Sequence, residues 1–188
     1  MKSKYIHYKL LEKCKHGSNK AQFEIYKLYY KGMYNVSLRM VQNSQEAEDV
    51  IQEAFLSAFE KLETWSEEVS FGSWLKKIVI NKSLDYLKKR KMQLTELDGK
   101  EPVNDENNSE DLEIISLKVE EIKRAVNNLP EKYRIITLMF LFEGYSHDEI
   151  SEIAGITPET SRVRFKRAKD MIVKSPEIKE AFEKISMN

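Results

Sequence analysis

Apolar residues at intervals of three and four positions recur along most of this sequence, and this spacing is the feature that most limits its fold. The longest unbroken stretch covers residues 47–62, where alanine, valine, isoleucine, phenylalanine and leucine keep the spacing for four turns. Such spacing places apolar side chains on one face of an α-helix, and alternating runs typical of strands do not occur at useful length. The sequence therefore predicts an all-α protein.

A break in composition divides the helical segments into two groups. Residues 93–113 are rich in acidic residues and asparagine and include a glycine and a proline, as is typical of flexible linkers. The 188 residues suffice for two small domains, each with a modest core. We expect helical domains at residues 5–92 and 114–175, joined by this acidic flexible linker and followed by a C-terminal tail at residues 176–188.

The charge is balanced over the whole chain but not along it. Thirty-one basic and 31 acidic residues cancel, yet residues 1–92 carry a net charge of +6, residues 93–122 of −8 and residues 123–188 of +2. Two basic blocks separated by an acidic stretch suggest polyanion-binding surfaces on both domains, although solvated helix faces alone could produce the same pattern.

Neither a secreted protein nor an enzyme is expected from the remaining residues. Cys14 is the only cysteine, so no disulfide within the chain is possible. The longest apolar block, residues 135–142, is far shorter than the roughly 20 residues that span a bilayer. The histidines lack metal-ligand spacing, and no phosphate-binding glycine loop occurs. We expect a cytoplasmic protein with no membrane span, catalytic site, metal or cofactor.

A helix-turn-helix pattern lies near the C-terminal end. Ser146 and Glu149 form a capping-box pair that begins one helix, and Gly155 permits a tight turn after it. Thr157 can cap a second helix with Pro158 at its first position. Two helices joined by a short glycine-containing turn are typical of a DNA-binding unit whose second helix enters the major groove.

The second of these helices has two distinct faces. At 100° per residue, four side chains point to the domain core: Ser161, Phe165, Ala168 and Ile172. Glu159 and Arg162 are candidates to read base edges, and the basic residues after them to contact phosphates or bases. The alternative is a solvated charged helix. The full candidate set is Pro158, Glu159, Thr160, Arg162, Val163, Arg164, Lys166, Arg167 and Lys169.

Four segments together resemble a known family. Residues 47–62 and 71–91 resemble the polymerase-clamp helix and the promoter-melting helix of bacterial sigma factors, and residues 129–157 and 160–170 resemble their domain that reads the minus-thirty-five element. The similarity extends over about residues 5–175 and points to the extracytoplasmic-function group, which has only sigma regions 2 and 4.

The resemblance implies roles for residues in the first domain. The acidic exterior of the 47–62 helix would dock on core RNA polymerase through Glu48, Asp49, Gln52 and Glu53; a solvated face is the alternative. Minus-ten recognition and melting would use a loop and the helix after it. The candidates are Trp65, Ser70, Phe71, Lys76, Lys77, Asn81, Lys82, Lys88, Lys89 and Arg90.

One polar pair in this helix has a second interpretation. Asn81 and Asp85 each follow an apolar residue, Trp74 and Ile78, by seven positions. This spacing predicts that both extend the apolar face and are partly buried, as a hydrogen-bonded internal polar pair.

The resemblance implies a transcription initiation factor whose partners are core RNA polymerase, promoter DNA and an anti-sigma factor, with a linker that passes through the polymerase channels. The alternative is a stand-alone helix-turn-helix regulator with an N-terminal sensor or dimerisation domain. That alternative requires a ligand pocket or a heptad dimer seam in the first domain, and the sequence shows instead an acidic helix followed by a basic, aromatic one.

Overall fold

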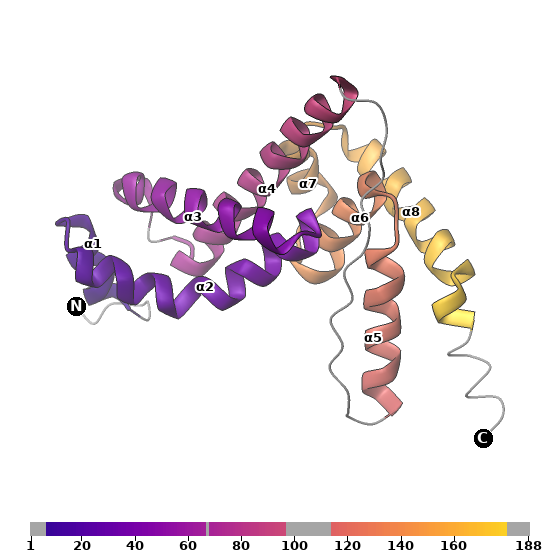
Figure 1. The fold of residues 1–188 in the computed structure, drawn as a ribbon, viewed down its shortest axis with the longest axis horizontal. Coiled ribbons are helices and arrows are strands. Elements are labelled where there is room, and N and C mark those ends of the chain that lie inside the picture. The colour runs from indigo at the N-terminus through magenta and orange to yellow at the C-terminus, as the bar shows by residue number, and fades with distance from the viewer. Residues whose placement is uncertain (1–6, 67, 97–113, 180–188) are drawn as a thin grey trace. The chain divides into compact units, whose positions relative to one another are not determined.

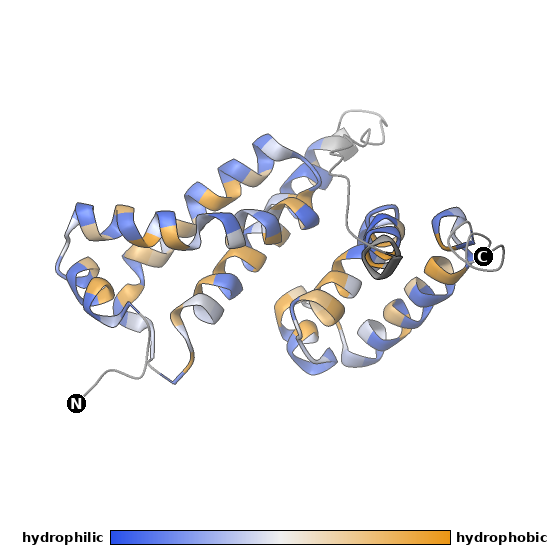
Figure 2. Ribbon diagram, turned by 90° about the horizontal axis from the view of Figure 1, so that it is seen from below, coloured by the Kyte–Doolittle hydropathy of each residue, from blue (hydrophilic) through white to orange (hydrophobic). Residues whose placement is uncertain are grey.

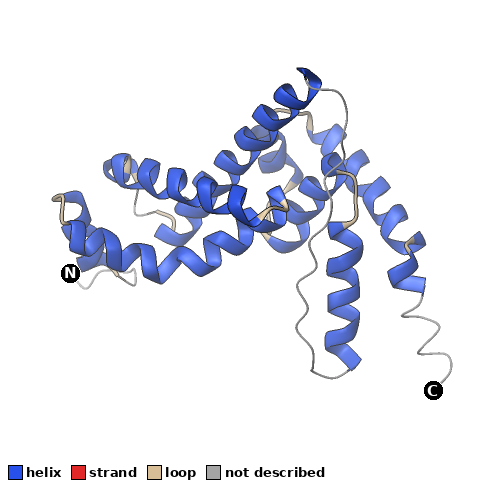
Figure 3. Cartoon of the chain, viewed as in Figure 1, coloured by secondary structure: helices blue, strands red, loops and turns tan. Residues whose placement is uncertain are grey.

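The computed structural model describes residues 7–66, 68–96 and 114–179, and every regular element in them is a helix (Figures 1 and 3). The prediction of an all-α protein is confirmed. The chain divides into two compact units, residues 1–105 and 106–188. Residues 97–113 of the expected linker and 180–188 of the expected tail lie outside the described residues, and the expected domain boundaries stay a prediction.

The described part of the first unit contains four α-helices and a short 3₁₀ turn. They are α1 (Tyr8–Lys15), α2 (Asn19–Val41), α3 (Ser44–Glu60), η1 (Leu62–Thr64) and α4 (Phe71–Glu96). Side-chain caps explain two of the starts: Ser18 Oγ accepts from the backbone N–H of Ala21, and Asn43 Oδ1 accepts from that of Glu46. The last helix continues four residues into the segment expected to be linker.

The core of this unit forms where α2, α3 and α4 pack against one another. The apolar stripe of residues 47–62 faces this core, as predicted: Phe59 is half-buried, and the other seven members are buried, namely Ala47, Val50, Ile51, Ala54, Phe55, Ala58 and Leu62. Leu56, which does not belong to the stripe, is exposed. Apolar and polar residues occupy different sides of these helices in Figure 2. Burial of this stripe is what holds α3 in place and leaves its polar side in solvent.

The expected burial of Asn81 and Asp85 is wrong, because both are exposed. The prediction extended the apolar face from Trp74 and Ile78, which are themselves only half-buried and lie at its edge. The buried line of α4 runs instead through Phe71, Leu75, Val79, Ser83 and Leu87. The internal polar pair of this core is therefore a different one: Ser83 Oγ donates to Ser37 Oγ at 3.3 Å and to the carbonyl of Val79 at 2.8 Å.

The second unit contains α5 (Ile114–Asn127), α6 (Glu131–Thr137), η2 (Leu138–Phe142), α7 (His147–Ala154) and α8 (Pro158–Lys174). The last helix packs on α6, α7 and α5. Its Ala168 and Ile172 lie with Leu129 and Tyr133 in one apolar cluster. The described start of the tail, residues 176–179, is helical.

A π-helical segment interrupts the apolar helix that begins after Pro130. Over Leu138–Phe142 the hydrogen bonds lengthen by one residue, as in the bond from the N–H of Glu143 to the carbonyl of Leu138 at 3.1 Å. Gly144 then ends the helix at a φ of 78°, as its position predicts. Helical periodicity did not predict the π segment.

Candidate nucleic-acid interface

Local side-chain bonds build the helix-turn-helix as the sequence predicts. Ser146 Oγ accepts from the N–H of Glu149 at 3.2 Å, and a Glu149 carboxylate oxygen accepts from the N–H of Ser146 at 2.8 Å. Gly155 has a φ of 65°, a left-handed conformation that favours glycine. Thr157 Oγ1 then accepts from the N–H of Thr160 at 3.2 Å and caps α8. The turn and the start of the second helix are thus set locally.

The outer face of α8 presents the predicted contact residues to solvent. Three of the nine are half-buried: Pro158, Thr160 and Arg164. The other six are exposed: Glu159, Arg162, Val163, Lys166, Arg167 and Lys169. Arg167 also bonds to the hydroxyl of Tyr133, and this bond lowers the pKa of that tyrosine. The face carries five basic side chains in little more than two turns, which suits a phosphate-lined groove.

An aromatic cluster fixes the inner face of α8 against the start of α7. The Phe140 ring lies 4.5 Å from that of Phe165 and stacks on His147 at 4.6 Å between centroids. His147 Nδ1 and Ser161 Oγ are 2.8 Å apart and form a hydrogen bond. Burial, and then the charge of Arg162, lower the pKa of His147 below its ordinary value. The first turns of α7 and α8 are therefore joined by a neutral imidazole.

Arg162 lies between two carboxylates, one from each helix. Its Nη2 is 3.6 Å from Asp148 Oδ1 on α7, and its Nη1 is 3.5 Å from Glu159 Oε1 on α8. Sequence reasoning missed Asp148, because no helical spacing relates it to Arg162. The available signal was that Asp148 follows His147 in the first turn of α7, opposite the first turn of α8.

The predicted minus-ten residues of the first unit do not form one exposed surface. Trp65 and Phe71 are buried, their rings 5.7 Å apart, and the Trp65 indole N–H donates to the carbonyl of Val69 at 3.0 Å. They close the two ends of the loop instead of standing in solvent. Ser70 is exposed, and its Oγ accepts from the N–H of Ser73 at the start of α4.

Three cations of α4 form ion pairs with carboxylates. Arg90 is half-buried, 2.8 Å from Glu46 Oε2 of α3, and also donates to the carbonyl of Val41. Lys82 is 3.3 Å from Glu53, and Lys88 is 3.9 Å from Asp85. The remaining candidates on α4 are Lys76, half-buried, and Lys77, Asn81 and Lys89, which are exposed.

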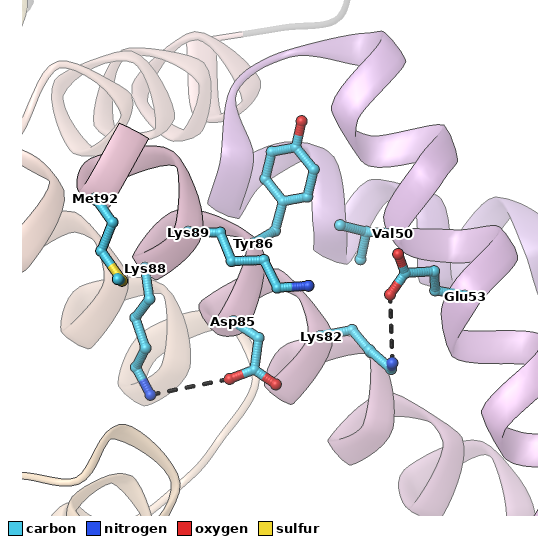
Figure 4. A pocket seen from close by; sticks show the side chains of 8 residues that line it. All are labelled: Val50, Glu53, Lys82, Asp85, Tyr86, Lys88, Lys89 and Met92. Atoms are coloured by element: carbon cyan, nitrogen blue, oxygen red, sulfur yellow. Dashed lines mark hydrogen bonds and ion pairs between the residues drawn. The ribbon is translucent and has the colours of Figure 1, made fainter. Parts of the chain in front are cut away.

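A pocket of about 250 Å³ lies between α3 and α4 (Figure 4). Both lysine–carboxylate pairs named above line it, together with Val50, Tyr86, Lys89 and Met92. Charges of both signs meet there, and the Glu53 and Lys82 side chains point toward each other across it. No group of histidine, cysteine and acidic side chains in the described part of the chain could hold a metal ion.

The acidic side of α3 is less open than its sequence suggests. The Tyr30 hydroxyl donates to a Glu48 carboxylate oxygen, and this bond raises the pKa of Tyr30 to about 12. Asp49, Gln52 and Glu53 are exposed on the same side of the helix. We call these three residues the α3 docking face.

Comparison with known proteins identifies the family. Residues 25–92 match the model for sigma-70 region 2, and residues 119–172 match the model for sigma-70 region 4. The RNA polymerase sigma-H factor of Pseudomonas aeruginosa is 30% identical over 193 residues, which cover 92% of this chain and 95% of the relative. The chain belongs to the extracytoplasmic-function group of RNA polymerase sigma factors. A second group member, SigW of Bacillus subtilis, is 29% identical over 88% of this chain and 94% of its own.

Solved structures show the same fold for this sigma factor. The sigma factor RpoE of Bartonella quintana, solved with the anti-sigma factor NepR, has a TM-score of 0.62 at 20% identity and covers 80% of this chain and 93% of its own. The structure of CnrH with the cytosolic domain of CnrY has a TM-score of 0.51 at 17% identity and covers 88% of this chain and 93% of its own.

Membership in this family establishes the general function. The sigma factor is a transcription initiation factor that directs RNA polymerase to promoters, and the stand-alone regulator is not favoured. Sigma factors are in general non-enzymatic initiation factors. Among the described helices, none combines the length and the apolar character that crossing a bilayer requires.

Proposed function

We propose that the two units of this sigma factor divide promoter recognition between them. The first, residues 5–92, binds core RNA polymerase through the α3 docking face and engages the minus-ten element with the loop before α4 and the exposed polar side of α4. The second, residues 114–175, reads the minus-thirty-five element with α8. The exposed basic face of α8 behind a capped turn is the observation that supports this most directly.

The structure refines which residues we assign to each contact. Glu48 is half-buried and bonded to Tyr30, so we propose the exposed residues Asp49, Gln52 and Glu53 as those that meet polymerase; Glu53 would exchange its ion pair with Lys82 for one with polymerase. Trp65 and Phe71 are buried, so we propose that they shape the minus-ten loop while Ser70 and the exposed lysines of α4 contact DNA. Arg90 is assigned to packing of α4 on α3 through Glu46.

Partners and location follow from the same proposal. Core RNA polymerase and promoter DNA are the direct partners, and the protein acts in the cytoplasm, where polymerase works. RpoE is solved in complex with an anti-sigma factor, which supports an anti-sigma partner for this chain as well. The acidic residues 93–113 are proposed to pass through the basic polymerase channels, where carboxylates substitute for phosphates.

Run-off transcription tests the general function. Purified protein mixed with core polymerase should direct specific transcripts from a template carrying a promoter mapped by transcript starts after overexpression. Filter binding with and without core polymerase then distinguishes a sigma factor, which needs polymerase to bind the promoter tightly, from a stand-alone regulator, which does not. Tight promoter binding by the free chain, unchanged by polymerase, would instead favour a stand-alone regulator.

Charge reversal tests the α3 docking face. The double variant Asp49→Lys and Glu53→Lys should lose association with core polymerase in a pull-down while far-UV circular dichroism stays unchanged. A matched control, Glu12→Lys with Glu24→Lys, makes the same change of charge on α1 and α2 and should still bind. Undiminished capture of the first variant would refute the docking role.

A further inference from the structure

The first turn of α7 carries a carboxylate that no base-reading role requires. Asp148 is the second residue of that helix and is exposed, so neither core packing nor the capping box uses it. Its carboxylate nevertheless lies 3.6 Å from the guanidinium of Arg162, which stands on the DNA-facing side of the other helix. The pair joins the two helices of the motif on the face that meets DNA.

The position of Asp148 is fixed by its neighbours along the chain. His147 is held on one side by stacking on Phe140 and on the other by its hydrogen bond to Ser161. The capping box of Ser146 and Glu149 fixes the same turn of backbone. Consecutive residues of α7 therefore meet consecutive residues of α8: His147 with Ser161, and Asp148 with Arg162. These contacts fix the backbone of Asp148 beside α8, so its carboxylate stays within reach of the Arg162 guanidinium.

We propose that Asp148 is a positioning residue for Arg162, and that together with Glu159 it sets how strongly this sigma factor prefers promoter over other DNA. The inference rests on the proposed function, in which α8 reads base edges. Asp148 need not touch DNA to act.

The donor geometry of arginine makes this arrangement workable. Each terminal nitrogen of a guanidinium carries two N–H groups in a planar fork. Nη2 lies 3.6 Å from Asp148 and Nη1 lies 3.5 Å from Glu159, so one N–H of each nitrogen can face its carboxylate while the second is left for another acceptor. Two parallel donors of this kind are what the O6 and N7 acceptors of guanine accept in the major groove.

The two carboxylates also act against unspecific binding. A lone exposed arginine is drawn to any phosphate, and phosphate contacts carry no sequence information. Flanked by two negative charges, the Arg162 guanidinium gains less from a phosphate, whose own charge the carboxylates repel. A guanine edge is uncharged, so its hydrogen bonds do not suffer this repulsion. Removing the charge of Asp148 should therefore raise the affinity for DNA that lacks the promoter sequence more than it raises the affinity for the promoter.

The decisive variant is Asp148→Asn, which keeps the shape and removes the charge. The complex of full-length protein and core polymerase is titrated with a duplex carrying the minus-thirty-five sequence of a mapped promoter, and with a duplex in which that sequence is scrambled. Because exposed ion pairs are weak, we expect the ratio of the two affinities to fall by about two- to fivefold, through tighter binding of the scrambled duplex.

Matched variants separate positioning from bulk charge. Glu152→Gln removes one charge from the same helix at an exposed position and should leave the ratio unchanged. Asp148→Glu keeps the charge and should restore most of the preference. In an Arg162→Ala background, Asp148→Asn should have no further effect on the ratio. 7-Deazaguanine lacks the N7 acceptor, and it can replace the guanines of the minus-thirty-five sequence one at a time. At one position this replacement should weaken binding of the wild-type protein, and it should weaken binding of the Asp148→Asn variant less.

The outcomes distinguish this inference from the proposed function. If the wild-type complex does not discriminate between the two duplexes, the proposed role of α8 fails. If the wild-type complex discriminates while Asp148→Asn leaves the ratio of affinities unchanged, only the positioning role is overturned. The same holds if Asp148→Asn changes this ratio equally in the wild-type and the Arg162→Ala backgrounds. An Arg162→Ala variant with full promoter preference would overturn it too, since Arg162 would then not be the reader.

Discussion

The cations predicted to touch DNA are held differently in the two units. On α4 three of them, Lys82, Lys88 and Arg90, lie in ion pairs, two with carboxylates of α3. On α8 only Arg162 is paired with described carboxylates, and the face carries four further cations. The same residue type thus stabilises helix packing in the first unit and stays available to a ligand in the second.

The difference follows from what each basic helix packs against. The polar side of α3 brings Glu46 and Glu53 to the edge of α4, where they pair with Arg90 and Lys82 at close range. The neighbours of α8 contribute mainly aromatic and apolar side chains such as Phe140 and Leu129, and Asp148 is the one carboxylate that the described part of α7 brings to its outer cations. A basic helix is therefore a DNA-binding candidate only once its partners are known.

The largest expected effects test whether the units are separate. Leu75 and Ile150 are fully buried in the first and second unit. Replacing either by Ala should cost its own unit about 2 to 5 kcal/mol of unfolding free energy, because a cavity remains. Both tryptophans, Trp65 and Trp74, lie in the first unit, so fluorescence in a urea titration reports on that unit alone.

Leu75→Ala should lower the urea midpoint measured by tryptophan fluorescence. Ile150→Ala should leave that midpoint unchanged and lower only the midpoint measured by circular dichroism, which reports on both units. If Ile150→Ala moves the fluorescence midpoint equally, the two units unfold as one.

The next effect concerns the paired arginine of the first unit. Arg90→Ala removes both the bond to Glu46 and the bond to the Val41 carbonyl, and leaves a half-buried carboxylate without its cation. We expect a loss of about 2 to 3 kcal/mol in the stability of that unit, measured by urea titration of tryptophan fluorescence. Lys89→Ala, on the exposed side, is the control. Equal urea midpoints for wild type and Arg90→Ala would contradict the packing role, and Arg90 would again be a candidate DNA contact.

The exposed arginine of the second unit should behave in the opposite way. Arg162→Ala should leave stability within experimental error but weaken promoter binding by about 1 to 3 kcal/mol, with relaxed specificity at one base pair. Fluorescence anisotropy on a panel of minus-thirty-five substitutions measures both. Lys166→Ala is the comparison, expected to weaken all duplexes alike. A uniform loss for Arg162→Ala would make it a phosphate contact.

The smallest effect is the pH dependence of the second unit. The pKa of His147 is lowered in the folded state, so the unfolded state binds a proton more readily. The stability that His147 contributes is therefore full above its ordinary pKa of about 6.5 and is lost as pH falls through the lowered folded pKa.

Circular dichroism melts between pH 7.5 and pH 5 should show this decline for wild type and a shallower one for His147→Asn. An unchanged slope for His147→Asn would assign the pH dependence to other groups.

Much of the second unit was predictable because its signals are local. The caps at Ser146 and Thr157 and the glycine turn at Gly155 each depend on residues within three or four positions, so the local sequence is enough to predict them. The faces of α8 follow from helical geometry alone. What could not be predicted there was the pair of Asp148 and Arg162, which needs α7 to lie across α8.

The first unit was predictable in its helices and less so in its surface. The stripe of residues 47–62 located α3 and its core face correctly. The line of burial on α4 was misplaced by a few residues, because a 26-residue helix presents several overlapping apolar lines and only its partners select one. Trp65 gives the same lesson: the resemblance made it a candidate for minus-ten recognition, and packing against Phe71 buried it.

The sequence by itself determined the helical class, the capped helix starts, the glycine turn and the amphipathic face of α8, since all of these depend on neighbours along one helix or one turn. Only the tertiary structure decided which charges are paired, which polar residues are buried and which aromatic rings close a loop. Those outcomes depend on distances between residues of different helices, such as Glu46 and Arg90, and no spacing within a single helix encodes them.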